Sequence, residues 1–180
     1  LERTLAVQLH IPLYAADPDL VHLGDKSHGR ELFGKVGVNY PRGAEHLRDE
    51  DDIIAVLAEL RGPDPGLRRA VVKLNEGFSG EGNAMFDFGD APTGRLLEPW
   101  IRRNLFEKLR FEAEGESFEP FMAKYREMGG IVEEYIGGRA KQSPSAQYRI
   151  DPTGQLDLVS THDQVTGGQS GQVFEGCRFP

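Results

Sequence analysis

The most informative part of the chain is Val71-Val72-Lys73-Leu74-Asn75-Glu76-Gly77-Phe78-Ser79-Gly80-Glu81-Gly82-Asn83-Ala84-Met85-Phe86. Its apolar and β-branched ends predict two strands joined by a glycine-rich loop. Glycines at 77, 80 and 82 let the backbone approach a ligand and turn N–H groups toward it. Lys73 precedes the loop, where its charge can meet anionic oxygens. This pattern favours a polyphosphate-binding loop, with a solvated surface hairpin as the alternative.

The order of these parts distinguishes the loop from other phosphate-binding motifs. A P-loop carries its lysine after the glycines and opens a helix, and a Rossmann fingerprint also requires a helix at that point. A protein kinase has its lysine on a later strand. Here the lysine comes first and a strand follows the loop.

Composition limits the class of protein. The 180 residues are 38% hydrophobic with ten Phe, which is sufficient for one domain or two small ones. The net charge of -8 argues against a general nucleic-acid or membrane-surface binder. The single cysteine, Cys177, favours a reducing compartment and hence a cytoplasmic location. The chain starts at Leu1 rather than Met and ends at Pro180, so we expect a fragment of a larger protein.

Hydrophobic periodicity and turn residues predict an α+β chain. Asp25 or Ser27 can cap a helix to about Val36, with Leu32, Phe33 and Val36 on one face. An acidic start and an apolar stripe predict a helix from about residue 50 to 60. The other elements expected are helices at 1–9, 99–111 and 117–128, strands at 11–14 and 131–136, and a hairpin over 146–161.

Several segments together resemble the ATP-grasp superfamily of carboxylate–amine ligases, and the tail is similar to its peptide-ligase branch. The segments are Leu20 to Lys26, Arg30 to Phe33, Gly37 to Gly43, Lys73 with loop 76–83, Val132 to Ile136, Ser160 to Val165 and Gly176 to Pro180. The resemblance implies an ATP-grasp fold with two α+β subdomains and the nucleotide between them, truncated in its C-terminal part. Residues 1–24 would end a preceding α/β domain, 25–136 would form the N-terminal subdomain with its glycine-rich lid, and 137–180 would begin the C-terminal subdomain.

The resemblance also implies roles for residues. Lys26 would contact the phosphates of ATP, and Lys73 would contact the α-phosphate region and the edge of the adenine. The lid would close over the β- and γ-phosphates, and residues 133–136 would lie along the adenine and bind it largely through backbone N–H and C=O groups. His162 could line the pocket or be structural. The candidate ATP-binding residues are Lys26, Lys73, Glu76, Ser79, Gly80, Gly82, Glu133, Glu134, Tyr135, Ile136 and His162. No catalytic residue or metal ligand is assigned, since the family's magnesium-binding acids lie later in its fold.

The activity implied is ATP-dependent amide or peptide bond formation through an acyl phosphate, with ATP and Mg²⁺ as cofactors. The expected partners are ATP, a small carboxylate and an amine, without nucleic acid or membrane, and the assembly considered is a homodimer. A non-catalytic ATP-binding module and an ATP-grasp kinase remain as alternatives.

Overall fold

The computed structural model describes residues 1–77, 80–138, 142–151, 153–168 and 170–180. Its helices are α1 (Glu2–Leu9), the 3₁₀ helix η1 (Pro18–Gly24), α2 (Lys26–Val36), α3 (Glu50–Arg61), the 3₁₀ helix η2 (Gly94–Leu96), α4 (Leu97–Lys108) and α5 (Phe118–Met128). Its strands are β1 (Gly43–Leu47), β2 (Arg69–Leu74), β3 (Asn83–Asp87), β4 (Leu109–Phe111), β5 (Gly130–Glu134), β6 (Pro144–Ile150), β7 (Leu156–Gly167) and β8 (Val173–Arg178).

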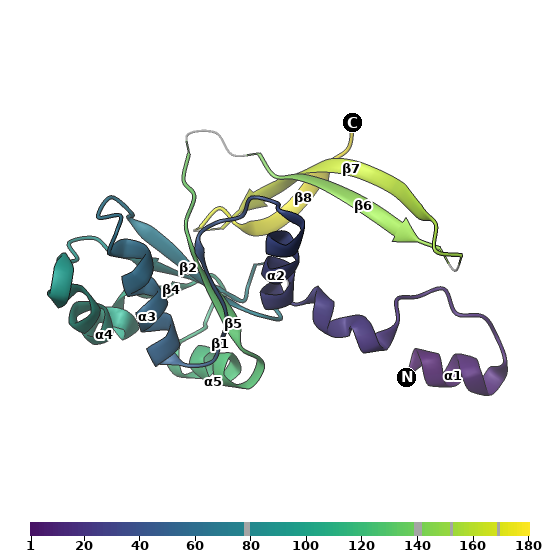
Figure 1. Cartoon of the computed structure of the whole chain (residues 1–180), viewed down its shortest axis with the longest axis horizontal. Helices are drawn as coiled ribbons and strands as arrows, with labels where there is room; N and C mark the ends of the chain where they lie inside the picture. The colour runs from purple at the N-terminus through teal and green to yellow at the C-terminus, as the bar shows by residue number, and fades with distance from the viewer. Residues whose placement is uncertain (78–79, 139–141, 152, 169) are drawn as a thin grey trace.

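The strands form two antiparallel sheets, so the expected α+β class is confirmed. The first sheet has the order β1-β5-β2-β3-β4, and the second has the order β6-β7-β8. Figure 1 shows the β6–β7 hairpin reaching away from the first sheet and over the N-terminal segment. None of the described helices combines the length and apolar character that crossing a membrane requires.

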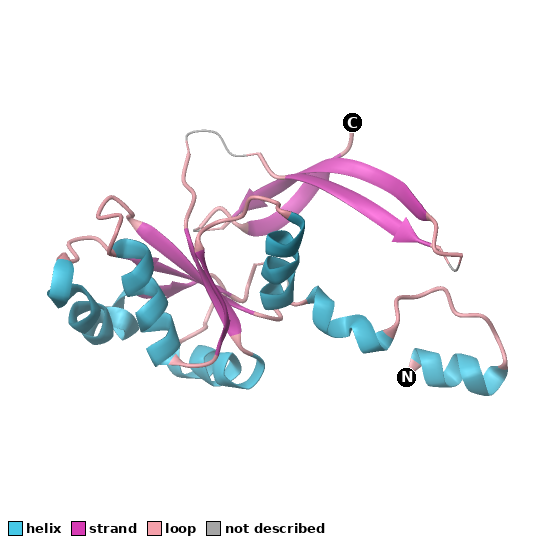
Figure 2. Ribbon diagram, viewed as in Figure 1, coloured by secondary structure: helices cyan, strands magenta, loops and turns pink. Residues whose placement is uncertain are grey.

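The two faces of the first sheet differ because side chains alternate along each strand. On β2, Ala70, Val72 and Leu74 belong to the hydrophobic core that α3, α4 and α5 complete. Phe86 on β3 lies in the same core, and Trp100 of α4 packs edge-on against its ring at 6.4 Å. The alternate positions of β2 therefore face the other side of the sheet, where α2 lies (Figure 2). Lys73 occupies one of those positions.

Local capping signals were good predictors of helix starts. Asp25 caps α2 by accepting the N–H of His28 at 2.8 Å, as one of the two predicted caps. Asp49 caps α3 by accepting the N–H of Asp52 at 3.0 Å. Gly37 ends α2 at φ 72°, a left-handed conformation that favours glycine.

Three local predictions were wrong. Residues 11–14 are irregular instead of a strand. The helix expected to reach Phe111 ends at Lys108, because Leu109 pairs with Phe86 as the start of β4. The apolar stripe of α2 is exposed: Leu32, Phe33 and Val36 are 39%, 46% and 70% accessible. Instead α2 buries a polar face that includes Ser27 and Arg30.

Strands β1 and β8 were not anticipated from the sequence. β1 is short and its register with β5 shifts between Ala44 and Leu47. Within this bulge His46 adopts φ 59°, a left-handed conformation that is uncommon for a residue with a side chain. The bulge therefore sets the position of the His46 imidazole at the edge of the first sheet.

Candidate functional site

A pocket of about 580 Å³ lies between the two sheets. From α2 and the first sheet it is lined by Lys26, Lys73 and Asn83, and from the second sheet and its β7–β8 turn by Gln164, Thr166 and Gln172. The rest of its lining comes from Gly80, residues 136–138, 142–143 and Gly171. The pocket thus combines two ammonium groups with amide side chains and a glycine-rich backbone.

Lys26 opens α2 and reaches the end of β2. Its Nζ donates to the carbonyl oxygens of Leu74 at 2.9 Å and Asn75 at 3.4 Å, where the glycine-rich loop begins. Ser27 strengthens this junction, because its hydroxyl donates to Asn75 Oδ1 at 2.7 Å. The start of α2 is therefore fastened to the first turn of the loop.

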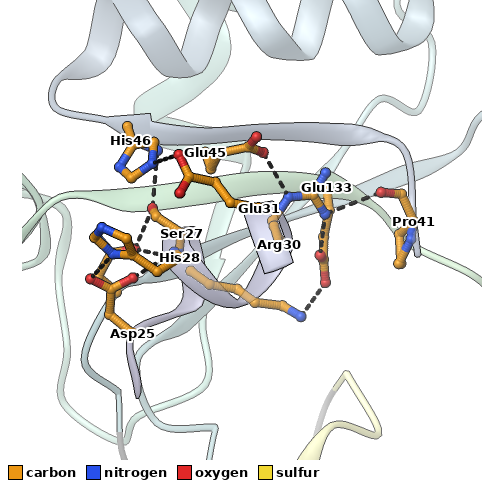
Figure 3. Close-up of polar contacts among 11 residues, drawn as sticks. Asp25, Ser27, His28, Arg30, Glu31, Pro41, Glu45, His46 and Glu133 are labelled. Carbon is orange, nitrogen blue, oxygen red and sulfur yellow. Dashed lines mark hydrogen bonds and ion pairs between the residues drawn. The ribbon is translucent and has the colours of Figure 1, made fainter. Parts of the chain in front are cut away.

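Lys73 faces the pocket from the sheet side. It is opposite Asn83 across the β2–β3 pair, and both residues line the pocket. Its Nζ forms an ion pair with Glu133 of β5. Glu133 also accepts from Arg30 Nη1 at 3.1 Å, and Arg30 pairs with Glu45 through Nε at 3.1 Å (Figure 3). This largely buried network of charges thus fixes the position of the Lys73 ammonium group.

Electrostatics at the pocket favour an anion. Burial lowers the pKa of the Lys26 ammonium below its usual value, and the positive charge of Lys73 lowers it further. The carboxylates of Glu133 and Asp25 act in the opposite direction and offset part of this lowering. A bound anion would stabilise the protonated form of Lys26.

The loop between β2 and β3 closes tightly at its base. The Leu74 N–H donates to the Gly82 carbonyl at 2.9 Å, and a Cβ on Gly77 would lie 2.9 Å from Gly82 Cα. Gly80 has φ 88°, and a Cβ there would lie 2.9 Å from the Gln172 carbonyl oxygen. The loop therefore approaches the β7–β8 turn with its backbone. Glu76 is exposed, and Ser79 lies outside the described residues.

We expect Gly82→Ala to lower the free energy of unfolding by about 1–3 kcal/mol, because its Cβ would lie 2.8 Å from Gly77 Cα and the base of the loop would have to open. Urea denaturation measures this. The matched control is Gly29→Ala in α2, where an added Cβ meets nothing within 4 Å and should raise stability by about 0.5–1 kcal/mol. Equal stability of Gly82→Ala and wild type would contradict this account of the loop.

The predicted adenine segment, 133–136, is only partly directed at the pocket. The Glu134 N–H donates to the Arg42 carbonyl at 2.8 Å, and its carboxylate pairs with the Arg42 side chain. Tyr135 stacks on Arg69 at 4.3 Å and donates its hydroxyl to the Ser170 carbonyl at 2.8 Å. Ile136 lines the pocket. The expected adenine contact was largely through the backbone, and the Tyr135 N–H also donates within the protein, to the Arg69 carbonyl at 3.1 Å. The adenine role of residues 133–136 stays a prediction.

His162 is not brought to this pocket. It lines a separate hollow with Pro144 and Arg178, and its ring lies 5.3 Å from that of Phe179. The structural alternative for His162 fits this position better than contact with the ligand of the lysine pocket.

Sequence reasoning missed the amide-bearing side of the pocket. Gln164 and Thr166 lie two residues apart on β7, and a polar alternation of this kind was the available signal. Two buried amide oxygens, Asn83 Oδ1 and Gln172 Oε1, have no hydrogen-bond partner among the described residues. Both residues line the pocket, so a ligand carrying N–H or O–H donors would satisfy them.

Comparison with known proteins identifies one relevant similarity. No protein-family model matches the chain. The chain is 34% identical over 161 residues to L-propargylglycine--L-glutamate ligase from Streptantibioticus cattleyicolor. The match covers 87% of this chain, which spans only 30% of the length of that relative. This similarity indicates that the chain is related to a ligase.

Proposed function

We propose that this chain forms the nucleotide-binding part of an ATP-dependent carboxylate–amine ligase of the ATP-grasp type. The observation that carries the proposal is the meeting of Lys26, Lys73 and the glycine-rich loop at one pocket between two sheets. The 34% identity to a ligase over most of the chain adds independent support. Neither the loop nor the lysines alone would justify it, because glycine-rich loops are common.

The reaction proposed has two steps. A carboxylate oxygen attacks the γ-phosphorus of ATP, the bond to the β–γ bridging oxygen breaks, and ADP leaves with that electron pair. The amine nitrogen then attacks the carbonyl carbon of the acyl phosphate, phosphate leaves, and the amine loses a proton as the amide forms. Phosphoryl transfer requires mainly charge stabilisation and alignment. Lys26 and Lys73 would supply the charge, and the loop would exclude water over the phosphates.

The resemblance to the family implies Mg²⁺, but the described residues of the pocket do not supply the usual ligands for it. Mg²⁺ is usually held by carboxylates together with substrate phosphates. The described residues that line the pocket include no carboxylate, and the neighbouring Glu133 is committed to Lys73 and Arg30. The described residues of this pocket therefore do not fit a Mg²⁺ ion by themselves. The contribution of this chain is the cationic and backbone recognition of the phosphates.

The test is ADP release by the full-length protein with ATP, with an amino acid as the acid and a second as the amine. Release that requires both substrates supports the ligase. ATP binding without turnover would favour the alternative of a non-catalytic module, for which the specific observation is that the described part of the pocket lining contains no carboxylate. A stable phosphate ester as product would indicate a kinase.

The pH dependence of ATP binding provides a further prediction. Phosphate favours protonated Lys26, whose pKa is lowered in the free protein. ATP affinity should thus be constant at lower pH and fall by up to about tenfold per pH unit as the pH rises through that pKa. Titration calorimetry across the alkaline range measures the effect. Lys26→Arg should abolish the fall, because a guanidinium stays charged; an unchanged profile in this variant would contradict the assignment.

A further inference from the structure

A second cluster of polar side chains lies at the junction of α2 and β1, outside the lysine pocket. His28 and Glu31 come from α2 and His46 comes from β1. One ligand atom from each of the three lies within 4.8 Å of the other two. The His28 and His46 rings meet edge to face at 5.1 Å (Figure 3). This combination of two imidazoles and a carboxylate has no role in the proposed ligase chemistry.

Two local features of the backbone bring these three side chains together. His28 and Glu31 are three positions apart on a helix, so they lie on the same face. His46 reaches them because the β1 bulge holds it in a left-handed conformation, and its N–H donates to Ser27 Oγ at 3.0 Å. Its Nε2 then lies 2.9 Å from Glu31 Oε1. The bulge thus directs an imidazole at a carboxylate of the neighbouring helix.

The orientation of the His28 ring is also fixed, by a carboxylate of the preceding turn. Asp25 Oδ2 lies 2.8 Å from His28 Nδ1. Metal-binding histidines commonly give their second nitrogen to a carboxylate in this way, which fixes the ring and its tautomer. In this arrangement Nε2 of His28 is the nitrogen that remains to bind a ligand.

We propose that His28, Glu31 and His46 bind a divalent transition-metal ion of the Zn²⁺ type. Imidazole nitrogen with one carboxylate suits such ions, whereas Mg²⁺ and Ca²⁺ prefer oxygen ligands. Metal–ligand bonds of about 2.1 Å in a tetrahedron separate the ligand atoms by about 3.4 Å, so small side-chain rotations close the site. His46 is 42% exposed in its side chain, which gives an ion access and leaves a position for water. The alternative is a surface pair of histidine–carboxylate contacts without a metal.

The structural role of the ion would be to join β1 to α2. Ser27 links the same bulge to Asn75 at the start of the glycine-rich loop. The ion would therefore stabilise the segment from which Lys26 projects without entering the lysine pocket.

The experiment measures Zn²⁺ binding by the whole protein in competition with a chromogenic chelator. All variants carry Cys177→Ser, because the exposed thiol of Cys177 would also bind Zn²⁺. His46→Asn removes a ligand while tolerating the left-handed backbone. The matched control is His10→Asn, since His10 has φ 52° and lies away from the cluster at the end of α1. Glu31→Gln is a second ligand variant that leaves the bulge unchanged.

We expect one Zn²⁺ per chain, with affinity lowered at least about tenfold in His46→Asn and in Glu31→Gln and unchanged in His10→Asn. Co²⁺ substitution should give visible absorption bands that both ligand variants lose. Excess Mg²⁺ should not displace the ion. Equal Zn²⁺ affinity in the His46→Asn and His10→Asn proteins, with circular dichroism showing both folded, would overturn the proposal. ATP binding is measured separately, so failure here leaves the ligase proposal intact.

Discussion

Replacing Lys73 by methionine is expected to reduce the ATP-dependent turnover of the full-length protein by about 10²–10³-fold, which corresponds to about 2.7–4 kcal/mol of lost transition-state stabilisation. Methionine keeps the unbranched shape and most of the length of the side chain and removes the charge. Lys73 lines the pocket while pairing with Glu133, and the other lysine of the pocket, Lys26, is bonded to the carbonyl oxygens of Leu74 and Asn75. The loss should therefore appear in the phosphoryl-transfer step.

The measurement is steady-state ADP release at saturating acid and amine, together with ATP affinity by calorimetry. Glu133 keeps Arg30 as a partner in the variant but loses Lys73, so some loss of stability is expected as well. Circular dichroism and urea denaturation establish that the variant is folded under the conditions of the assay. The control is Lys124→Met on α5, whose side chain is 48% exposed and pairs with Glu116, and neither residue lines the pocket. Activity in Lys73→Met equal to that of Lys124→Met would remove the main support for a phosphate site.

Replacing Glu133 by glutamine should lower the free energy of unfolding by about 3–5 kcal/mol. Glu133 is buried between Lys73 of β2 and Arg30 of α2, and the Arg30 side chain is only 5% exposed. The substitution leaves Lys73 without its carboxylate, and Arg30 keeps its ion pair with Glu45 and its hydrogen bond to the Pro41 carbonyl. Removing one partner of a buried ion network is costly because the remaining charges stay desolvated.

Urea denaturation of the two adjacent variants tests this expectation. Glu134→Gln is the matched control, since Glu134 is next in the chain but pairs with Arg42, whose side chain is 47% exposed. Exposed pairs contribute about 0–1 kcal/mol, so this control should remain close to wild type. If the two variants were equally stable, the Arg30–Glu133–Lys73 network would contribute no more to the free energy of unfolding than an exposed ion pair does.

The sequence predicted those parts of the fold that depend on neighbouring residues. Asp25 marked the start of α2 because a cap acts within three residues, and the acidic residues at 49–52 marked the start of α3 through the helix dipole. The apolar and β-branched residues around Lys73 predicted its strand from local composition in the same way. Strand β4 was missed because its pairing with β3 depends on contacts more than twenty residues away, and tertiary pairing overrides local helix preference at Leu109.

The candidate site likewise contains some residues that could be predicted from the sequence and others that could not. Lys26, Lys73 and the glycines could be identified because each has a local chemical signature. The partner of Glu133 could not, since Arg30 is 103 positions away and is buried on the polar face of α2. Nor could Gln172, which reaches the pocket through the packing of a second sheet. Contacts between sheets leave little trace in a single sequence.

The packing of Trp100 on Phe86 has a practical consequence for any spectroscopic study of this chain. Trp100 is the single tryptophan, and it reports on the core beneath the first sheet. When Trp100 is excited selectively, at the red edge of its absorption band, its emission would therefore report the unfolding of the first sheet and its helices alone. The β6–β8 half could unfold with little change in this signal, so a fluorescence midpoint measures only one part of the molecule. Tyr148 on β6 offers a place to introduce a second indole as a reporter for the other half.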